Sequence, residues 1–193
     1  MIPAASAGTA TVHALARRAL GYSVSMMAFA KYEGLGNDFI VLEVGDESAL
    51  DPAVAVRLCD RHFGVGADGV LLMVPPVSAG ARARMLVLNA DGSRPEMCGN
   101  GLRCFALHLA RRDSAAGISY LIDTDAGPRL CEVERHGSVA EVKVEMGRGR
   151  PEGVHTTHFA GAEVRFMRVS MGNPHAIIFD SGFGDATLDR LGS

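Results

Sequence analysis

The chain from residue 28 onward alternates short apolar runs with turns rich in Gly, Asn and Asp. Short apolar runs bounded by such turn residues are typical of β-strands. The segments that predict strands are residues 28–33, 39–44, 70–74, 85–88, 118–123, 130–134 and 139–145. We expect a loop at residues 34–38 between the first two strands, because its glycines permit conformations that other residues avoid.

Two segments have the period of a helix instead. Asp51 is a typical N-cap, Pro52 suits the first helical turn, and we expect this helix to end at Gly64. A second helix is predicted over residues 99–112, with apolar positions at helical spacing. These positions are Leu102, Phe105, Ala106 and Leu109. Because polar residues are sparse until its end, we expect this helix to be internal and surrounded by sheet, in a strand-rich α+β fold.

Two Gly-Asn loops, each leading into an apolar strand, point to a duplicated fold. They lie at residues 36–42 and 172–179. We expect a first domain over residues 27–147 and an incomplete second domain over residues 148–193. Chance similarity between two short segments is the alternative.

The first 26 residues differ from the rest of the chain. They contain no acidic residue and carry Arg17 and Arg18. Since Met26 and Met27 directly precede the first predicted strand, an upstream start codon or a short disordered tail explains residues 1–26 better than a targeting signal.

Composition and charge narrow the function classes. The formal net charge is −3 and the pI about 6.1, without a cluster of Lys or Arg. Such a chain lacks the basic patch of a nucleic-acid-binding or membrane-binding protein, and no apolar stretch reaches membrane-spanning length. Its four cysteines do not have the paired spacing of a secreted disulfide protein. We therefore expect a cytoplasmic protein with a small-molecule partner.

Cys98 is the strongest candidate for chemistry. It directly precedes the second predicted helix, where unpaired N–H groups and the helix dipole stabilise a thiolate. Gly99 and Gly101 leave the backbone open, so that a substrate carboxylate can approach the same N–H groups. The other cysteines lie in helices or a strand and are expected to be inert core residues. They are Cys59, Cys104 and Cys131.

Amide side chains and one histidine also stand at the ends of predicted elements. Asn37, Asn89, Asn100 and Asn173 lie in loops, and His175 opens a strand. Amides at such positions make turns, but beside glycines they also suit recognition of the carboxylate and ammonium of an amino acid. His175 either polarises a thiol or is a hydrogen-bonded structural histidine.

The sequence provides little for a cofactor. Its lysines are Lys31 and Lys143, and neither suits the Schiff-base position of a pyridoxal-phosphate enzyme. The glycine-rich loops lack Walker spacing, and no His, Cys and Asp residues have zinc-site spacing. We therefore expect no cofactor and no metal.

Taken together, these motifs resemble diaminopimelate epimerase, the cofactor-independent enzyme that interconverts LL- and meso-diaminopimelate. The matching blocks lie at residues 31–39, 64–69, 89–93, 97–104, 124–127 and 171–175. The Asn-Ala-Asp-Gly-Ser block at 89–93 and the Met-Cys-Gly-Asn-Gly-Leu-Arg-Cys block at 97–104 are highly specific in combination. Proline racemase and the phenazine-biosynthesis isomerases are similar in fold, but the asparagine of the second block favours diaminopimelate.

The resemblance implies two similar α+β domains, each a curved sheet wrapped around a central helix, in a protein that forms a homodimer. It also implies a two-base mechanism, in which one cysteine removes the α-proton and another protonates the opposite face. By resemblance, Cys98 is one of the pair and His175 tunes the thiols. The implied substrate-binding residues are the N–H groups of Gly99 and Asn100 and the side chains of Asn37, Asn89 and Asn173.

The sequence departs from the family pattern in one respect. The later Glu-Arg-Gly and Cys-Gly-Ser/Thr-Gly blocks, which supply the second cysteine, are not in this chain. We therefore expect a truncated chain that does not epimerise alone. Two other interpretations stay open: a thiol hydrolase that uses Cys98 and His175, and a non-catalytic fragment that binds a ligand or partner.

Overall fold

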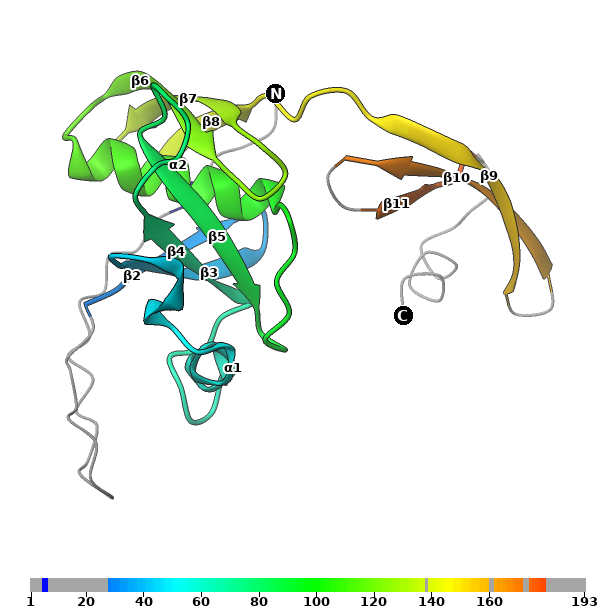
Figure 1. Ribbon diagram of the computed structural model, residues 1–193, viewed down its shortest axis with the longest axis horizontal. Coiled ribbons are helices and arrows are strands. Elements are labelled where there is room, and N and C mark those ends of the chain that lie inside the picture. The colour runs from blue at the N-terminus through cyan, green and yellow to red at the C-terminus, as the bar shows by residue number, and fades with distance from the viewer. Residues whose placement is uncertain (1–4, 7–27, 138, 160–161, 172–173, 180–193) are drawn as a thin grey trace. The chain divides into compact units, whose positions relative to one another are not determined.

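The computed structural model describes residues 5–6, 28–137, 139–159, 162–171 and 174–179. The chain divides into two compact units, Met1–Met146 and Gly147–Ser193, each of which is described by itself (Figure 1). No helix among the described residues is long and apolar enough to cross a membrane.

Within the described residues, the first unit is built on one sheet with the strand order β1-β8-β7-β6-β5-β4-β3-β2. The strands are β1 (Ala5–Ser6), β2 (Ala30–Gly34), β3 (Asn37–Glu43), β4 (Gly69–Val74), β5 (Ala83–Asn89), β6 (Gly117–Asp123), β7 (Arg129–His136) and β8 (Val139–Val144). The sheet is mixed, because β3 pairs with β4 and β5 with β6 in parallel, while the other neighbours are antiparallel. Of residues 1–26, the described pair Ala5–Ser6 lies beside Val139 and Ala140 of β8.

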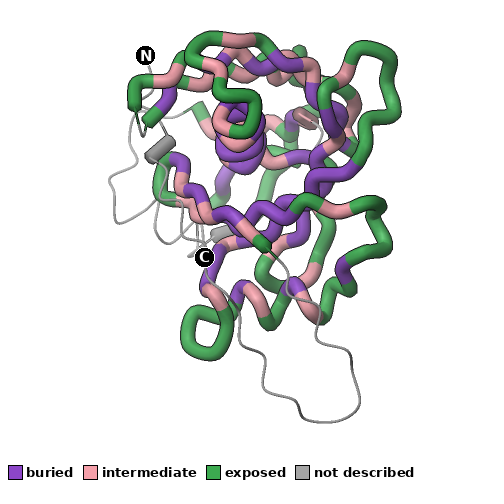
Figure 2. Tube along the Cα trace, turned by 90° about the vertical axis from the view of Figure 1, so that its left-hand side faces the viewer, coloured by how far each residue is buried: buried purple, intermediate pink, exposed green. Residues whose placement is uncertain are grey.

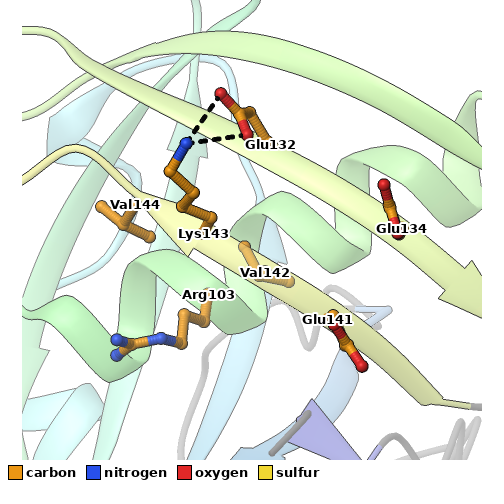
Figure 3. Close-up of a pocket in the computed structure, with 7 residues that line it drawn as sticks. All are labelled: Arg103, Glu132, Glu134, Glu141, Val142, Lys143 and Val144. Atoms are coloured by element: carbon orange, nitrogen blue, oxygen red, sulfur yellow. Dashed lines mark hydrogen bonds and ion pairs between the residues drawn. The ribbon is translucent and has the colours of Figure 1, made fainter. Parts of the chain in front are cut away.

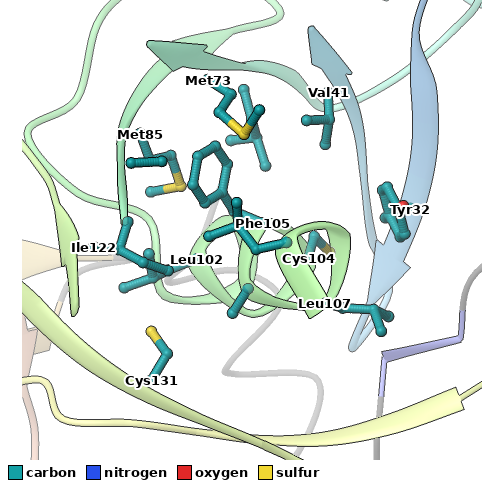
Figure 4. Close-up of a cluster of buried hydrophobic side chains, with 14 of the residues drawn as sticks. Tyr32, Val41, Met73, Met85, Leu102, Cys104, Phe105, Leu107, Ile122 and Cys131 are labelled. Carbon is teal, nitrogen blue, oxygen red and sulfur yellow. The ribbon is translucent and has the colours of Figure 1, made fainter. Parts of the chain in front are cut away.

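The helix α2 (Gly99–Arg112) lies inside the curve of this sheet (Figures 1 and 2). It contacts strands from both ends of the sheet order, among them β2, β3, β7 and β8. The four apolar positions predicted from helical spacing, Leu102, Phe105, Ala106 and Leu109, are all fully buried. Phe105 projects among core side chains that include Met73 and Met85 (Figure 4). Truncating such a phenylalanine to alanine costs about 3–5 kcal/mol, so α2 anchors the unit. The predicted α+β fold with an internal helix is confirmed.

A second, smaller core lies on the other face of β3, β4 and β5. Ile40, Val70 and Leu86 point to this face and pack with the buried residues Ala55 and Cys59 of the helix α1 (Pro52–Cys59). Strands buried on both faces carry continuous apolar runs without alternation, as β4 does. A short 3₁₀ helix, η1 (Glu47–Ala49), precedes α1.

The end of α1 differs from the prediction. Asp51 caps the helix as expected, by accepting a hydrogen bond from the Ala53 N–H, but the helix ends at Cys59 and not at Gly64. The carboxylate of Asp60 accepts hydrogen bonds from the next backbone N–H groups and folds the chain into a turn. Gly64 then packs so closely on the helix end that a Cβ there would lie 2.1 Å from the carbonyl oxygen of Arg57.

The loop predicted at residues 34–38 is also shorter in the structure. Leu35 and Gly36 have φ angles of 56° and 86° and form a two-residue turn between β2 and β3. Two successive residues with positive φ match the right-handed twist of a hairpin. The pairing therefore extends to Gly34 and Asn37, and Asn37 lies at the start of β3 rather than in a loop.

The described part of the second unit is an antiparallel sheet with the order β11-β10-β9. Its strands are β9 (Arg150–Phe159), β10 (Ala162–Ser170) and β11 (Pro174–Ile177). Strand β11 lies in the segment 172–179 that sequence similarity to residues 36–42 singled out, and it pairs with β10 through Val169 and His175.

Candidate active site

Cys98 is the N-cap of α2. Its backbone is extended, with φ of −136° and ψ of 113°, and its Sγ accepts a hydrogen bond from the Gly101 N–H at 3.3 Å. Its carbonyl oxygen accepts from the N–H of Leu102 at 2.8 Å. The predicted position directly before the helix is confirmed, and the thiol is half-buried. An N-terminal helix dipole favours negative charge at this position.

Gly99 and Asn100 form the first two positions of α2. The first N–H groups of a helix have no intrahelical acceptor, so these two can bind an anion beside the thiol. Gly101 packs closely on the thiol, since a Cβ there would lie 3.4 Å from Sγ of Cys98 and 3.0 Å from Leu71. The glycine at this position thus allows the helix start to approach β4.

The segment that leads into Cys98 is held by the turn after β6. Arg94 binds Asp125 through its Nε at 2.7 Å and also pairs with Glu47. The carbonyl oxygen of Glu96 accepts a hydrogen bond from the N–H of Ala126 at 3.1 Å, and Met97 is buried. These contacts fix the approach to the helix, and with it the position of the thiol.

Asn37 and Asn100 meet beside this helix start. The Asn100 Nδ2 donates a hydrogen bond to Oδ1 of Asn37 at 2.7 Å, which joins residues far apart in the sequence. Asn37 in turn donates from Nδ2 to Asp68 at 3.2 Å, and Asn100 Oδ1 accepts from Nη1 of Arg103 at 2.9 Å. Two of the predicted site residues therefore belong to one hydrogen-bonded chain.

Charged residues surround Asp68, the last acceptor in this series of hydrogen bonds. Arg61 donates to both oxygens of Asp38 and to Asp68, and Lys31 pairs with Asp38 at 2.8 Å. The hydrogen bond from Arg61 and, after it, the one from Lys31 hold the pKa of Asp38 well below its usual range. The carboxylate of Asp38 therefore stays ionised, and the loop that carries Arg61 is tied to the hairpin that carries Asn37.

Asn89 is the last residue of β5, as predicted for a strand end. Its Nδ2 donates to Oγ of Ser93 at 2.9 Å, so its amide also closes the turn that follows. The N–H of the next residue, Ala90, donates to the carbonyl oxygen of Asp68 at 3.1 Å. Asp68 thus links the strand end that carries Asn89 to the hairpin that carries Asn37.

The remaining thiols are buried, as predicted. Burial raises the pKa of Cys104 and of Cys131 to about 12. Burial also raises the pKa of Cys59. These three cysteines are therefore protonated core residues near neutral pH. Cys98 differs from them in burial, because its thiol is half-buried.

The other predicted residues lie in or near the second unit. His175 is an exposed residue of β11 and pairs with Val169 of β10. Asn173 lies outside the described residues. The structure therefore brings Asn37 to the helix start that carries Cys98 and Asn100. Asn89 is connected to them indirectly, through Asp68, and His175 is described only within its own sheet.

Sequence reasoning assigned no role to Asp68, Arg61 or Arg103. Asp68 and Arg103 stand within matched blocks, at 64–69 and 97–104, but neither block reveals which side chain meets an asparagine. The contacts depend on the parallel pairing of Phe39 with Gly69, which sets Asp68 beside the hairpin.

A cavity of about 460 Å³ lies along β8 and shares Arg103 with the hydrogen-bonded chain (Figure 3). Its walls combine the apolar Val142 and Val144 with charged side chains, including the ion pair between Lys143 and Glu132. Cys98 is not among the described residues that line it. The cavity therefore adjoins α2 at Arg103, and its described lining does not include the thiol.

The fold is that of amino-acid racemases and epimerases. A hydroxyproline epimerase from Agrobacterium vitis is similar with a TM-score of 0.63 and 16% identity, over 79% of this chain and 51% of that one. A probable proline racemase from Agrobacterium radiobacter is similar with a TM-score of 0.65 and 13% identity, over 79% and 52%. At such identities the similarity establishes the fold alone.

Sequence comparison identifies the family. The profile described as diaminopimelate epimerase matches residues 29–150, and the chain belongs to this family. The chain is 40% identical over 185 residues to the diaminopimelate epimerase of Heliobacterium modesticaldum and 42% identical over 181 residues to that of Desulforudis audaxviator. Both matches cover 86% of this chain, but the chain spans only 65% and 64% of the lengths of these relatives.

Proposed function

We propose that the chain binds diaminopimelate at the start of α2 and that Cys98 is one of the two acid–base groups that interconvert its LL and meso forms. The observation that carries this proposal is the half-buried thiol at the N-cap, with Sγ 3.3 Å from the Gly101 nitrogen. The family match supports the substrate. The product of such a reaction is a precursor of lysine and of peptidoglycan.

In the proposed reaction the Cys98 thiolate removes the proton from the α-carbon. The α-carboxylate lies against the N–H groups of Gly99 and Asn100, where the helix dipole stabilises the charge that develops on its oxygens. Asn37, Asn89 and Asn173 bind polar groups of the substrate in this proposal, and His175 tunes the thiol. Holding the substrate in a fixed geometry replaces part of the stabilisation that a cofactor would supply.

Inversion also needs an acid on the opposite face of the α-carbon. The other cysteines of the described chain are buried, and the pKa of Cys104 and of Cys131 is about 12. We therefore expect this chain to exchange the α-hydrogen with solvent but not to convert LL to meso at an ordinary enzymic rate.

The test is incubation of the purified chain with LL-diaminopimelate in deuterated water. The expected result is incorporation of deuterium at the α-carbon with little meso product. NMR measures the deuterium incorporation, and chiral chromatography measures the meso product. Rapid conversion to the meso form would contradict the inference that Cys98 is the single acid–base thiol of this chain. Binding without deuterium incorporation would contradict the acid–base role and favour a non-catalytic ligand-binding fragment.

We infer an extension at residues 1–26, an epimerase domain at 27–147 and part of a second one at 148–193. The four cysteines, all within described residues, are free, which fits a reducing compartment such as the cytoplasm. A homodimer is inferred from the family resemblance, and light scattering coupled to size-exclusion chromatography tests it.

A further inference from the structure

We propose that Asp68 and Arg103 are positioning residues that fix which way the amides of Asn37 and Asn100 point. This inference rests on the proposed function, because it concerns the groups that would hold the substrate beside Cys98. It goes beyond that function by giving a role to two side chains that hydrogen-bond to the asparagines and not to the thiol in the described structure.

The four side chains form one chain of hydrogen bonds with a direction. Arg103 donates to Asn100, Asn100 donates to Asn37, and Asn37 donates to Asp68, at 2.9, 2.7 and 3.2 Å. An arginine can only donate and an ionised carboxylate can only accept, whereas an amide can present either its oxygen or its nitrogen. The two ends therefore dictate the orientation of both amides between them.

Asp68 is itself held in one orientation. Its Oδ2 also accepts from the N–H of Asp38 at 3.0 Å, and its Oδ1 accepts from Arg61 at 2.8 Å. Its backbone is fixed as well, since its N–H donates to the carbonyl oxygen of Asp38 and its carbonyl accepts from Ala90. An acceptor held in this way cannot rotate to follow a turned amide.

This order decides what the asparagines offer to a ligand. The described bonds use one hydrogen and one lone pair of each amide, and an amide has two of each. The remaining hydrogen and lone pair of each amide therefore point in set directions. A ligand with both a carboxylate and an ammonium group, such as an amino acid, needs that fixed pattern, because a turned amide would present a donor where an acceptor is required.

The decisive variant is Asp68→Asn. An amide at position 68 has a single oxygen, but the native carboxylate serves Arg61 on one side and Asn37 and the Asp38 N–H on the other. The bond to a charged donor is the stronger one, so we expect the oxygen to turn to Arg61 and the new NH₂ group to face Asn37. The side-chain NH₂ signals of Asn37 and Asn100 in ¹⁵N spectra should then shift and exchange with solvent faster.

Removing the competing donor should reverse this effect. In the double variant Arg61→Ala/Asp68→Asn the amide at position 68 can return its oxygen to Asn37. We expect Asp68→Asn to weaken binding of diaminopimelate by about tenfold to a hundredfold, as for a partly buried donor left unpaired. The double variant should bind within about threefold of Arg61→Ala alone, and a purely structural role for Asp68 would not produce this rescue.

Two further variants complete the experiment. Arg103→Met removes the donor at the other end of the series of hydrogen bonds and should affect the NH₂ signal of Asn100 more than that of Asn37. Glu132→Gln breaks an exposed ion pair with Lys143 that is not part of the series of hydrogen bonds from Arg103 to Asp68. It should leave both NH₂ signals and the binding of diaminopimelate unchanged. Circular dichroism and thermal melting verify that each variant is folded.

The inference is overturned if Asp68→Asn leaves the two NH₂ signals unshifted and the affinity for diaminopimelate within twofold of that of the wild-type protein. It is also overturned if the double variant binds diaminopimelate as weakly as Asp68→Asn does. If the wild-type chain does not bind diaminopimelate, the proposed function fails. The ligand-free NH₂ signals of the variants then still decide whether Asp68 and Arg103 orient the amides.

Discussion

The two ends of α2 both carry polar networks, but they leave different groups available. At the C-terminal end His108 contacts the Tyr32 hydroxyl through Nδ1 and Glu43 through Nε2, each at 3.0 Å, and Arg112 pairs with Glu43 at 2.6 Å. At the N-terminal end Cys98 is half-buried. Both ring nitrogens of His108 are used, whereas the asparagines at the other end retain hydrogen-bonding capacity.

The charges at the two ends explain the difference. Arg111 and Arg112 in the last turn complement the negative end of the helix dipole, and the guanidinium of Arg111 lies 5.6 Å from the centre of the Tyr32 ring. The first turn of α2 contains no acidic residue, so its positive end is available to an anion. The C-terminal end of the helix is thus closed by paired polar groups, and the N-terminal end is the one to which the proposed function assigns the chemistry.

The largest expected effect separates the thiols along this helix. Cys98→Ala should lower α-hydrogen exchange by at least about a hundredfold, because loss of an acid–base group costs about 10²–10⁴ in rate. Its free energy of unfolding should fall by only about 1 kcal/mol, the usual contribution of a cap. Deuterium incorporation and urea denaturation measure the two quantities.

Cys104→Ala is the matched control, since it removes the same atom from the buried interior of α2. It should lower stability and keep the exchange rate of the folded protein. Equal loss of exchange in the two variants would contradict the assignment of chemistry to Cys98.

A smaller effect is expected at the closed end. Glu43→Gln weakens the contacts to His108 and Arg112 and should lower the free energy of unfolding by about 1 kcal/mol, because Glu43 is partly exposed. Calorimetric titration should give an unchanged affinity for diaminopimelate. A tenfold loss of affinity would show that the two ends are coupled.

The smallest effect concerns pH. Burial lowers the pKa of His108 from 6.5, partly offset by Glu43. Below pH 6.5 the unfolded chain therefore binds a proton that the folded chain resists, and the unfolding free energy falls as the pH falls, by at most about 1.4 kcal/mol per pH unit. His108→Gln should lose stability less steeply between pH 7.5 and 5.5 in urea denaturation. Equal slopes of unfolding free energy against pH in the wild-type protein and in His108→Gln would contradict the lowered pKa of His108.

Local sequence signals predicted much of this fold. The position of Cys98 before a helix and the apolar spacing from Leu102 to Leu109 sufficed to place α2, because cap and periodicity act within a few residues. Polar residues were expected to be sparse along the helix until its end, and the partly buried network around His108 was not foreseen. Its partners, Tyr32 and Glu43, come from strands far away in the sequence.

The orientation of the site could not be predicted for the same reason. Asn37 was expected in a loop, and its place in β3 follows from the tight turn at Leu35 and Gly36. Its contact with Asp68 depends on the pairing of two parallel strands, which no local pattern encodes. The candidate residues could thus be named from the sequence, but their hydrogen-bond partners could not.

Titration of the ¹⁵N-labelled chain with diaminopimelate tests most directly whether the N-terminal end of α2 is the end that binds the substrate. The backbone amide signals along the helix report on both ends in one experiment. We predict that the signals of Gly99, Asn100 and Gly101 shift in a saturable manner while those of His108, Arg111 and Arg112 stay in place. Shifts confined to the second group, or no shift at residues 99–101 at saturating ligand, would contradict the account.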